Sequence, residues 1–153
     1  MRWLHIDKFV EFRKGEYARA VKGVTLAEDH IHDQFPGYPC MPPTLVIEAL
    51  AQTAGILVGV TSDFKQKIIL GKVAKATFPS LALPGDHLSL EATLADVRDE
   101  GATAECRASV GERTVAEVEL MFVNLDSFLS EEEAAAQPNF VFSDNFVSLL
   151  RMN

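Results

Sequence analysis

The feature that most constrains the fold is an apolar stretch that begins at two consecutive prolines, Pro42 and Pro43, and runs to Val60. Proline is favoured in the first turn of a helix, where its missing N–H leaves no gap in the hydrogen-bond ladder. The length of the stretch and its Ala and Leu content favour a helix over a strand. Because it is apolar on nearly every side, the stretch predicts one central helix that other elements cover on most faces.

The segments on either side of this helix are typical of β-strands. Residues 3–12 surround a possible strand, and residues 16–26 alternate with the two-residue period of a strand. Turn signals separate four further predicted strands, at 67–78, 86–98, 102–110 and 113–124. Strands, one buried helix and then a run of antiparallel strands predict an α+β domain with a sheet wrapped on the helix. A single sheet on one helix leaves a sheet edge uncovered, which favours a dimer.

The chain divides into a domain at residues 1–125 and a C-terminal extension at residues 126–153. Ser130 and Glu133 form a capping box, which predicts a helix over residues 126–137. The remainder of the extension is rich in Phe, Val and Leu, so we expect it to pack on its own subunit or on a neighbouring one.

Composition and charge exclude several classes of protein. The chain has 153 residues, of which 48% are hydrophobic and 24% charged, which is ordinary for one globular domain. A net charge of −8 disfavours general nucleic-acid binding, because phosphate contacts require a basic surface. Two isolated cysteines do not indicate a disulfide framework. The first residues lack the apolar core of a signal peptide, and no uninterrupted apolar run has membrane-spanning length, so a cytoplasmic location is expected.

Glu48 is the residue that most strongly suggests chemistry. It lies in the middle of the apolar helix, where an ionised carboxylate without partners is costly, and a buried carboxyl group can serve as a general acid. Gln52 lies one helical turn further on and can orient it. The residues alone leave a structural alternative open, in which Glu48 reaches an edge or is satisfied by backbone groups at an interface.

The loop before the helix, residues 28–41, carries three polar candidates. His30 and His32 suit general-base work, because the imidazole titrates near neutral pH, and Gln34 follows them. Asp29 and Asp33 beside the histidines could suggest a metal site. However, His-x-His in a polar turn is weak evidence, and surface histidines are the commoner explanation, so no metal is expected.

Residues 34–52 form a motif that is far more specific. They read Gln-Phe-Pro-Gly-Tyr-Pro-Cys-Met-Pro-Pro before a helix that contains Glu-Ala-Leu-Ala-Gln. This order resembles the signature of the 3-hydroxyacyl-acyl carrier protein dehydratases of fatty acid synthesis. That signature is His-Phe-Pro-Gly-x-Pro-x-Met-Pro-Gly followed by Glu-Ala-x-Ala-Gln. The likeness extends through residues 71–78, 83–86 and 115–121 and covers about residues 5–124.

The resemblance implies a hotdog fold, in which an antiparallel sheet wraps a long central helix and two sheets join in a homodimer, with a hexamer of three dimers as an alternative. It implies a hydro-lyase that removes water from a 3-hydroxyacyl thioester to give a trans-2-enoyl thioester, without metal or redox cofactor. In such enzymes a His of one subunit removes the α-proton, and a Glu or Asp on the helix of the other subunit helps the β-hydroxyl leave as water. The partner would be acyl carrier protein or a coenzyme A thioester. The matching positions are Glu48 and Gln34 for catalysis and Phe35, Gly37, Pro43, Thr44 and Gln52 for substrate binding.

Two positions depart from the family signature. Gln34 occupies the position of the catalytic His, and a neutral amide cannot accept the proton. Pro43 occupies the position of a Gly whose N–H would bind the thioester carbonyl, and proline has no N–H. The acid is therefore present, while the base and one oxyanion donor are missing.

Three accounts of these departures are open. In the first, His32 or His30 replaces the base; we favour His32, because residues i and i+2 share one side of an extended segment. In the second, the domain binds acyl thioesters or a carrier protein without catalysis. In the third, Glu48 acts toward water as base or nucleophile, which gives an acyl thioesterase.

An acidic enzyme needs a local basic patch to receive an acidic carrier protein. Two groups of basic residues are candidates for this patch, and a solvated strand face is the alternative interpretation of each. They are Lys65, Lys67, Lys72 and Lys75, and Arg13 with Lys14.

Overall fold

The computed structural model describes residues 4–130, and its central element is the predicted helix, α2 (Pro43–Thr61). The helix begins at the second proline, which occupies the first turn as expected. Among the residues of α2, all of which the structure describes, only Thr44 is exposed. The prediction of a central helix covered on most faces is therefore confirmed.

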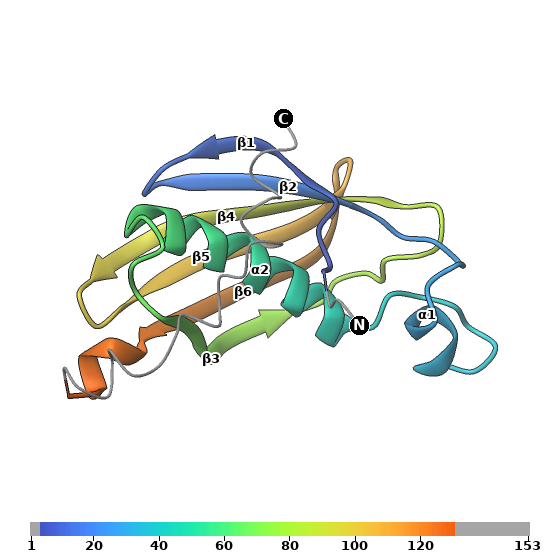
Figure 1. The fold of residues 1–153 in the computed structure, drawn as a ribbon. Helices are drawn as coiled ribbons and strands as arrows, with labels where there is room; N and C mark the ends of the chain where they lie inside the picture. Colours follow the sequence, from blue (N-terminus) through green and yellow to red (C-terminus); the bar gives the residue numbers. More distant parts are fainter. Residues whose placement is uncertain (1–3, 131–153) are drawn as a thin grey trace.

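Within residues 4–130, one antiparallel sheet of six strands packs against α2 (Figure 1). Its strand order is β1-β2-β4-β5-β6-β3, so β1 and β3 form the two edges. The strand bounds are β1 (Lys8–Arg13), β2 (Tyr17–Gly23), β3 (Ile68–Thr77), β4 (His87–Arg98), β5 (Gly101–Val110) and β6 (Arg113–Asn124). A long helix covered by one antiparallel sheet confirms the α+β hotdog architecture that the sequence predicted.

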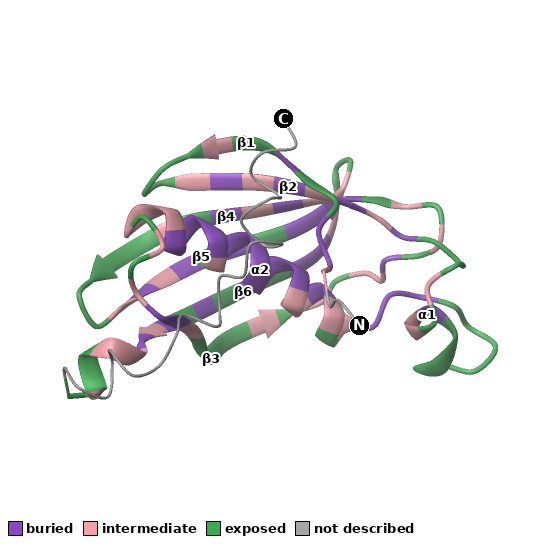
Figure 2. Ribbon diagram, in the orientation of Figure 1, coloured by how far each residue is buried: buried purple, intermediate pink, exposed green. Residues whose placement is uncertain are grey.

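The core lies between α2 and the inner face of the sheet (Figure 2). Buried and less buried residues alternate along β2, as expected for a strand with one covered face. The inner face carries many small side chains, which allow the helix to lie close to the strands. The buried alanines of the sheet are Ala18, Ala20, Ala92, Ala102, Ala104, Ala108 and Ala116.

Helix α2 is long and apolar enough to span a membrane by length and composition alone. Its side chains give a different explanation of this apolarity. Leu50, Ile56 and Leu57 are among the most deeply buried side chains of the described residues, and they belong to the core that the sheet covers. The core helix of a globular domain explains this composition.

Two predictions about local structure need correction. Residues 28–41 were expected to form a loop throughout, but they contain a short helix, α1 (His30–Asp33), which is anchored by the buried Ile31. After β6 the chain forms a 3-10 helix, η1 (Leu125–Phe128), which overlaps the start of the α-helix predicted over 126–137. Glu133, the second residue of the predicted capping box, and the rest of the extension after residue 130 lie outside the described residues.

Candidate active site

Glu48 is held by a side-chain partner on its own helix. Thr44, Glu48 and Gln52 are four residues apart on α2 and therefore share one face. The Gln52 Nε2 donates a hydrogen bond of 2.8 Å to Glu48 Oε1, and the Gln52 Oε1 accepts one of 2.8 Å from the backbone N–H of His5. Gln52 is buried, whereas Glu48 is half-buried. Both ends of the Gln52 amide are thus engaged, which fixes the amide and orients the carboxyl group of Glu48.

The Pro-Gly part of the motif forms a tight turn ahead of α2. The backbone N–H of Tyr38 donates to the carbonyl of Phe35 over 2.9 Å, and Gly37 has a φ of +79°. Proline followed by a residue with positive φ is typical of a type II turn, where glycine avoids steric strain. Phe35 and Tyr38 are both exposed on this turn. The backbone conformation of the turn thus explains why a glycine stands at position 37, which was predicted to bind substrate. The exposed side chain of Phe35 is accessible to a substrate.

A surface pocket of about 270 Å³ lies where the loop meets the start of α2. It brings together two of the predicted site residues, Gln34 and Thr44. Because Pro43 has no N–H, Thr44 carries the first N–H of the helix, and first-turn N–H groups lack intrahelical acceptors. The pocket is lined by His30, Asp33, Gln34, Pro42, Thr44 and Leu45.

The extended conformation assumed for the two histidines is wrong. Residues 30–33 are helical, and Gln34 continues with helical angles of −71° and −44°. In a helix, residues four apart share a face, so His30 rather than His32 lies on the side of Gln34. The lining residues agree, because His30 lines the pocket and His32 does not. His32 is exposed, and its Nε2 donates to the carbonyl oxygen of Leu26 over 2.9 Å.

A cluster of charged and aromatic side chains that the sequence patterns did not predict lies behind His30. Lys22 Nζ donates to Glu28 Oε1 over 2.6 Å and keeps only 6% of its side-chain surface exposed. Glu28 Oε2 lies 3.9 Å from His30 Nε2. The rings of His5 and His30 meet edge to face with 5.7 Å between centroids. Lys22 continues the buried face of β2 that Ala18 and Ala20 form. A lysine on this apolar face was the sequence feature that could have revealed the cluster.

The environment of His5 makes the stability of the fold depend on pH. Burial lowers the pKa of His5 below its ordinary value of 6.5, as do His30 and Lys22, while Glu28 raises it. The unfolded chain therefore binds more protons just below pH 6.5 than the folded chain does. The stability that neutral His5 contributes is complete above pH 6.5 and is lost as the pH falls toward the lower folded-state pKa.

We therefore expect the free energy of unfolding to fall between about pH 7.5 and pH 5.5, and to fall less in His5→Gln. Urea unfolding at a series of pH values measures this slope. His87→Gln, at an exposed histidine of β4, is the matched control and should keep the wild-type slope. An equal slope in His5→Gln and wild type would contradict the assignment.

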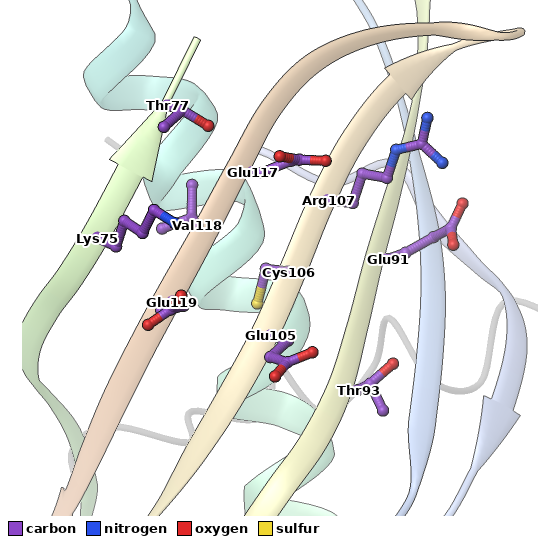
Figure 3. Close-up of a pocket in the computed structure, with 10 residues that line it drawn as sticks. All are labelled: Lys75, Thr77, Glu91, Thr93, Glu105, Cys106, Arg107, Glu117, Val118 and Glu119. Atoms are coloured by element: carbon purple, nitrogen blue, oxygen red, sulfur yellow. The ribbon is translucent and has the colours of Figure 1, made fainter.

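The structure changes the interpretation of the basic residues. Lys67 is buried and lies 3.2 Å from Asp126 Oδ1, so it is not a docking residue. Lys14 pairs with Asp63 over 2.6 Å. Lys75 is exposed on the outer face of the sheet, in a pocket that also contains four glutamates and Arg107 (Figure 3). These carboxylates weaken the attraction that Lys75 offers to an acidic protein. The glutamates are Glu91, Glu105, Glu117 and Glu119.

Comparison with known proteins agrees with the motif and the fold. The FabA-like domain family matches residues 2–119 of the chain. The chain belongs to the FabA-like family. Within this family it is 37% identical over 121 residues to the 3-hydroxyacyl-[acyl-carrier-protein] dehydratase FabZ of Levilactobacillus brevis, covering 78% of this chain and 82% of the relative. It is 38% identical over 122 residues to FabZ of Caldanaerobacter subterraneus subsp. tengcongensis, covering 79% and 86%.

Solved structures show the same fold at low sequence identity. The dehydratase heterocomplex ApeI:P from Xenorhabdus doucetiae aligns with a TM-score of 0.68 at 11% identity, covering 88% of each chain. The uncharacterized protein PH1136 from Pyrococcus horikoshii aligns with a TM-score of 0.66 at 16% identity, covering 82% of this chain and 88% of the other. The FabA-like family and the hotdog fold are therefore established, as the resemblance predicted.

Proposed function

We propose that this FabA-like protein is a 3-hydroxyacyl-thioester dehydratase of fatty acid biosynthesis, a lyase that forms trans-2-enoyl thioesters. The observation that carries the proposal is the carboxyl group of Glu48, oriented by the buried amide of Gln52 over 2.8 Å. A positioned carboxyl group is what the departure of a β-hydroxyl as water requires. The FabZ relatives, named as 3-hydroxyacyl-[acyl-carrier-protein] dehydratases, support the same reaction.

The pocket at the start of α2 supplies groups for the thioester. Thr44 lines this pocket and carries the first N–H of the helix, so it takes over from the family glycine that Pro43 replaces. Donors aimed at a developing oxyanion are worth about 10²–10³ in rate each. The Gln34 amide lies in the same pocket and can donate to the thioester carbonyl. Phe35 is exposed beside the pocket and can contact the phosphopantetheine arm of a carrier protein or coenzyme A.

Dimerisation through the β3 edge belongs to the same proposal. Strand β3 is an edge of the sheet, and its Leu70 and Val73 are each 38% exposed. An unpaired edge with exposed apolar side chains favours pairing with a second copy. A homodimer would join the two sheets and enclose an acyl chain between two copies, and a hexamer would assemble from three such dimers. The extension 126–153 would pack on its own or a neighbouring subunit.

One observation favours a second function. Gln34 cannot accept a proton, and Pro43 cannot donate its N–H, so two groups of the family chemistry are missing from their usual positions. A protein that binds acyl thioesters or an acyl carrier protein without converting them would tolerate both changes. In this second proposal, Glu48 and Gln52 hydrogen-bond the acyl group and do no chemistry.

The test is to incubate the protein with a 3-hydroxyacyl thioester and with a trans-2-enoyl thioester, each on carrier protein and on coenzyme A. Dehydration or hydration, followed by enoyl absorbance and mass spectrometry, is the expected result. Release of free thiol without interconversion would instead indicate an acyl thioesterase that uses Glu48 toward water. Binding of the thioester without either product would establish the non-catalytic alternative and overturn the dehydratase proposal.

A further inference from the structure

We infer that His30 is the general base that replaces the missing family histidine, an assignment that rests on the proposed dehydration. His30 is four residues before Gln34, and the helical backbone of residues 30–34 places both on one face. Both line the pocket at the start of α2 together with Thr44. His30, one turn upstream, therefore faces the same pocket that a histidine at position 34 would face.

The polar surroundings of His30 suit a base. Its Nε2 and the Oε2 of Glu28 are buried, lie 3.9 Å apart, and have no hydrogen-bond partner among the described residues. Hydrogen bonds between catalytic groups are often long before substrate binds and shorten in the complex. Glu28 is in turn fixed by Lys22, whose ammonium donates to it over 2.6 Å. A carboxylate behind an imidazole orients the ring and stabilises the imidazolium that forms after proton transfer.

His30 is also linked to Glu48 through contacts within one chain. The ring of His30 meets the ring of His5 edge to face, and the backbone N–H of His5 donates to Gln52 over 2.8 Å. Gln52 donates to Glu48 over 2.8 Å. His5 therefore supports the ring of His30 directly and the carboxyl group of Glu48 through Gln52, so the N-terminal segment supports the site.

The chemistry balances with these two groups. The Nδ1 of His30, the ring nitrogen that does not face Glu28, accepts the α-proton of the 3-hydroxyacyl thioester. The electron pair of that C–H bond forms the Cα–Cβ double bond as the Cβ–O bond breaks. Glu48 does not line the pocket of His30 in the same chain, so in the proposed dimer the departing hydroxyl group takes a proton from Glu48 of the partner subunit and leaves as water. Proton exchange of His30 and Glu48 with solvent restores the starting state.

His32 provides a matched comparison on the same short helix. It is exposed, lies outside the lining of the pocket, and bonds to the Leu26 carbonyl. A structural role for the cluster around His30 would reduce stability without changing the pH dependence of the reaction. A role as base would change both kcat and that pH dependence. The charged and titratable groups around His30 are His5, Glu28 and Asp33, with Lys22 bound to Glu28.

The experiment measures kcat and kcat/KM from about pH 5.5 to 9 in full-length wild type, His30→Gln, His32→Gln and the double variant His30→Gln/Gln34→His. We expect His30→Gln to lower kcat at least about 10²-fold and to remove the acidic limb of the kcat/KM profile. We expect His32→Gln to stay within about threefold of wild type. In the double variant, the family base returns at position 34, and we expect kcat to recover at least about tenfold relative to His30→Gln.

Each outcome decides a different point. Recovery in the double variant shows that a chain without His30 can fold, and thermal unfolding of each variant checks the folding of His30→Gln itself. If the wild type is active and His30→Gln keeps either the wild-type kcat or the wild-type pH profile, His30 is not the base. The dehydratase proposal is unaffected by that result. Loss of activity in His32→Gln but not in His30→Gln would assign the base to His32 instead. A wild type that binds thioester but does not convert it would overturn the dehydratase proposal and this inference together.

Discussion

Replacing Glu48 by Gln is expected to lower kcat for dehydration by about 10³-fold while leaving the fold intact. The new amide has nearly the same shape, and its oxygen can still accept the hydrogen bond that Gln52 donates to Glu48 over 2.8 Å. An amide cannot release a proton to a departing hydroxyl group. Substrate affinity should change little, because the loss falls on the transition state, where the proton moves.

Steady-state kinetics with a 3-hydroxyacyl thioester checks this prediction, and the thiol-release assay is run beside it. Glu119→Gln is the matched control, since Glu119 is exposed on the outer face of β6, away from α2. It should retain wild-type kcat. A Glu48→Gln variant with wild-type kcat would remove Glu48 from the reaction. An unchanged kcat with a raised KM would mean that Glu48 binds the substrate and does not take part in the chemical step.

The Glu48–Gln52 pair was predictable because its geometry is local. Two polar residues four apart in an apolar helix must share a face, and no tertiary information is needed to place them side by side. The strands were predictable for a similar reason, because period-two alternation and turn residues mark them along the chain. The structure confirms both, although β1 begins only at Lys8 and β2 already ends at Gly23, inside the ranges 3–12 and 16–26.

The surroundings of His30 were not predictable by the same means. Helix α1 has four residues and one buried apolar side chain, Ile31, which is too little to produce a helical period. The cluster joins residues from separate segments, because Lys22 lies near the end of β2, whereas His5 precedes β1. Only the register of the sheet and the packing of the loop bring such residues together, and that information is absent from local pattern.

The largest expected effect on stability is that of Gly101→Ala, at the start of β5. A Cβ atom built on Gly101 would overlap the carbonyl oxygen of Phe122 in the neighbouring strand β6, and it would lie 3.2 Å from Val123 Cα. Both neighbours are backbone atoms of a paired strand, so neither can move without disturbing the ladder between β5 and β6. We expect the free energy of unfolding to fall by at least about 3 kcal/mol.

Gly111→Ala separates this overlap from the general cost of replacing a turn glycine. Gly111 lies in the turn between β5 and β6 with a φ of +57°, and a Cβ there would meet nothing within 4 Å. Only the conformational cost of about 1 kcal/mol is therefore expected at Gly111. Urea unfolding of both variants measures the difference between them. Equal losses of stability would mean that the two strands separate easily at Gly101, whereas a loss confined to Gly101→Ala locates a tight backbone approach that the β5–β6 pairing requires.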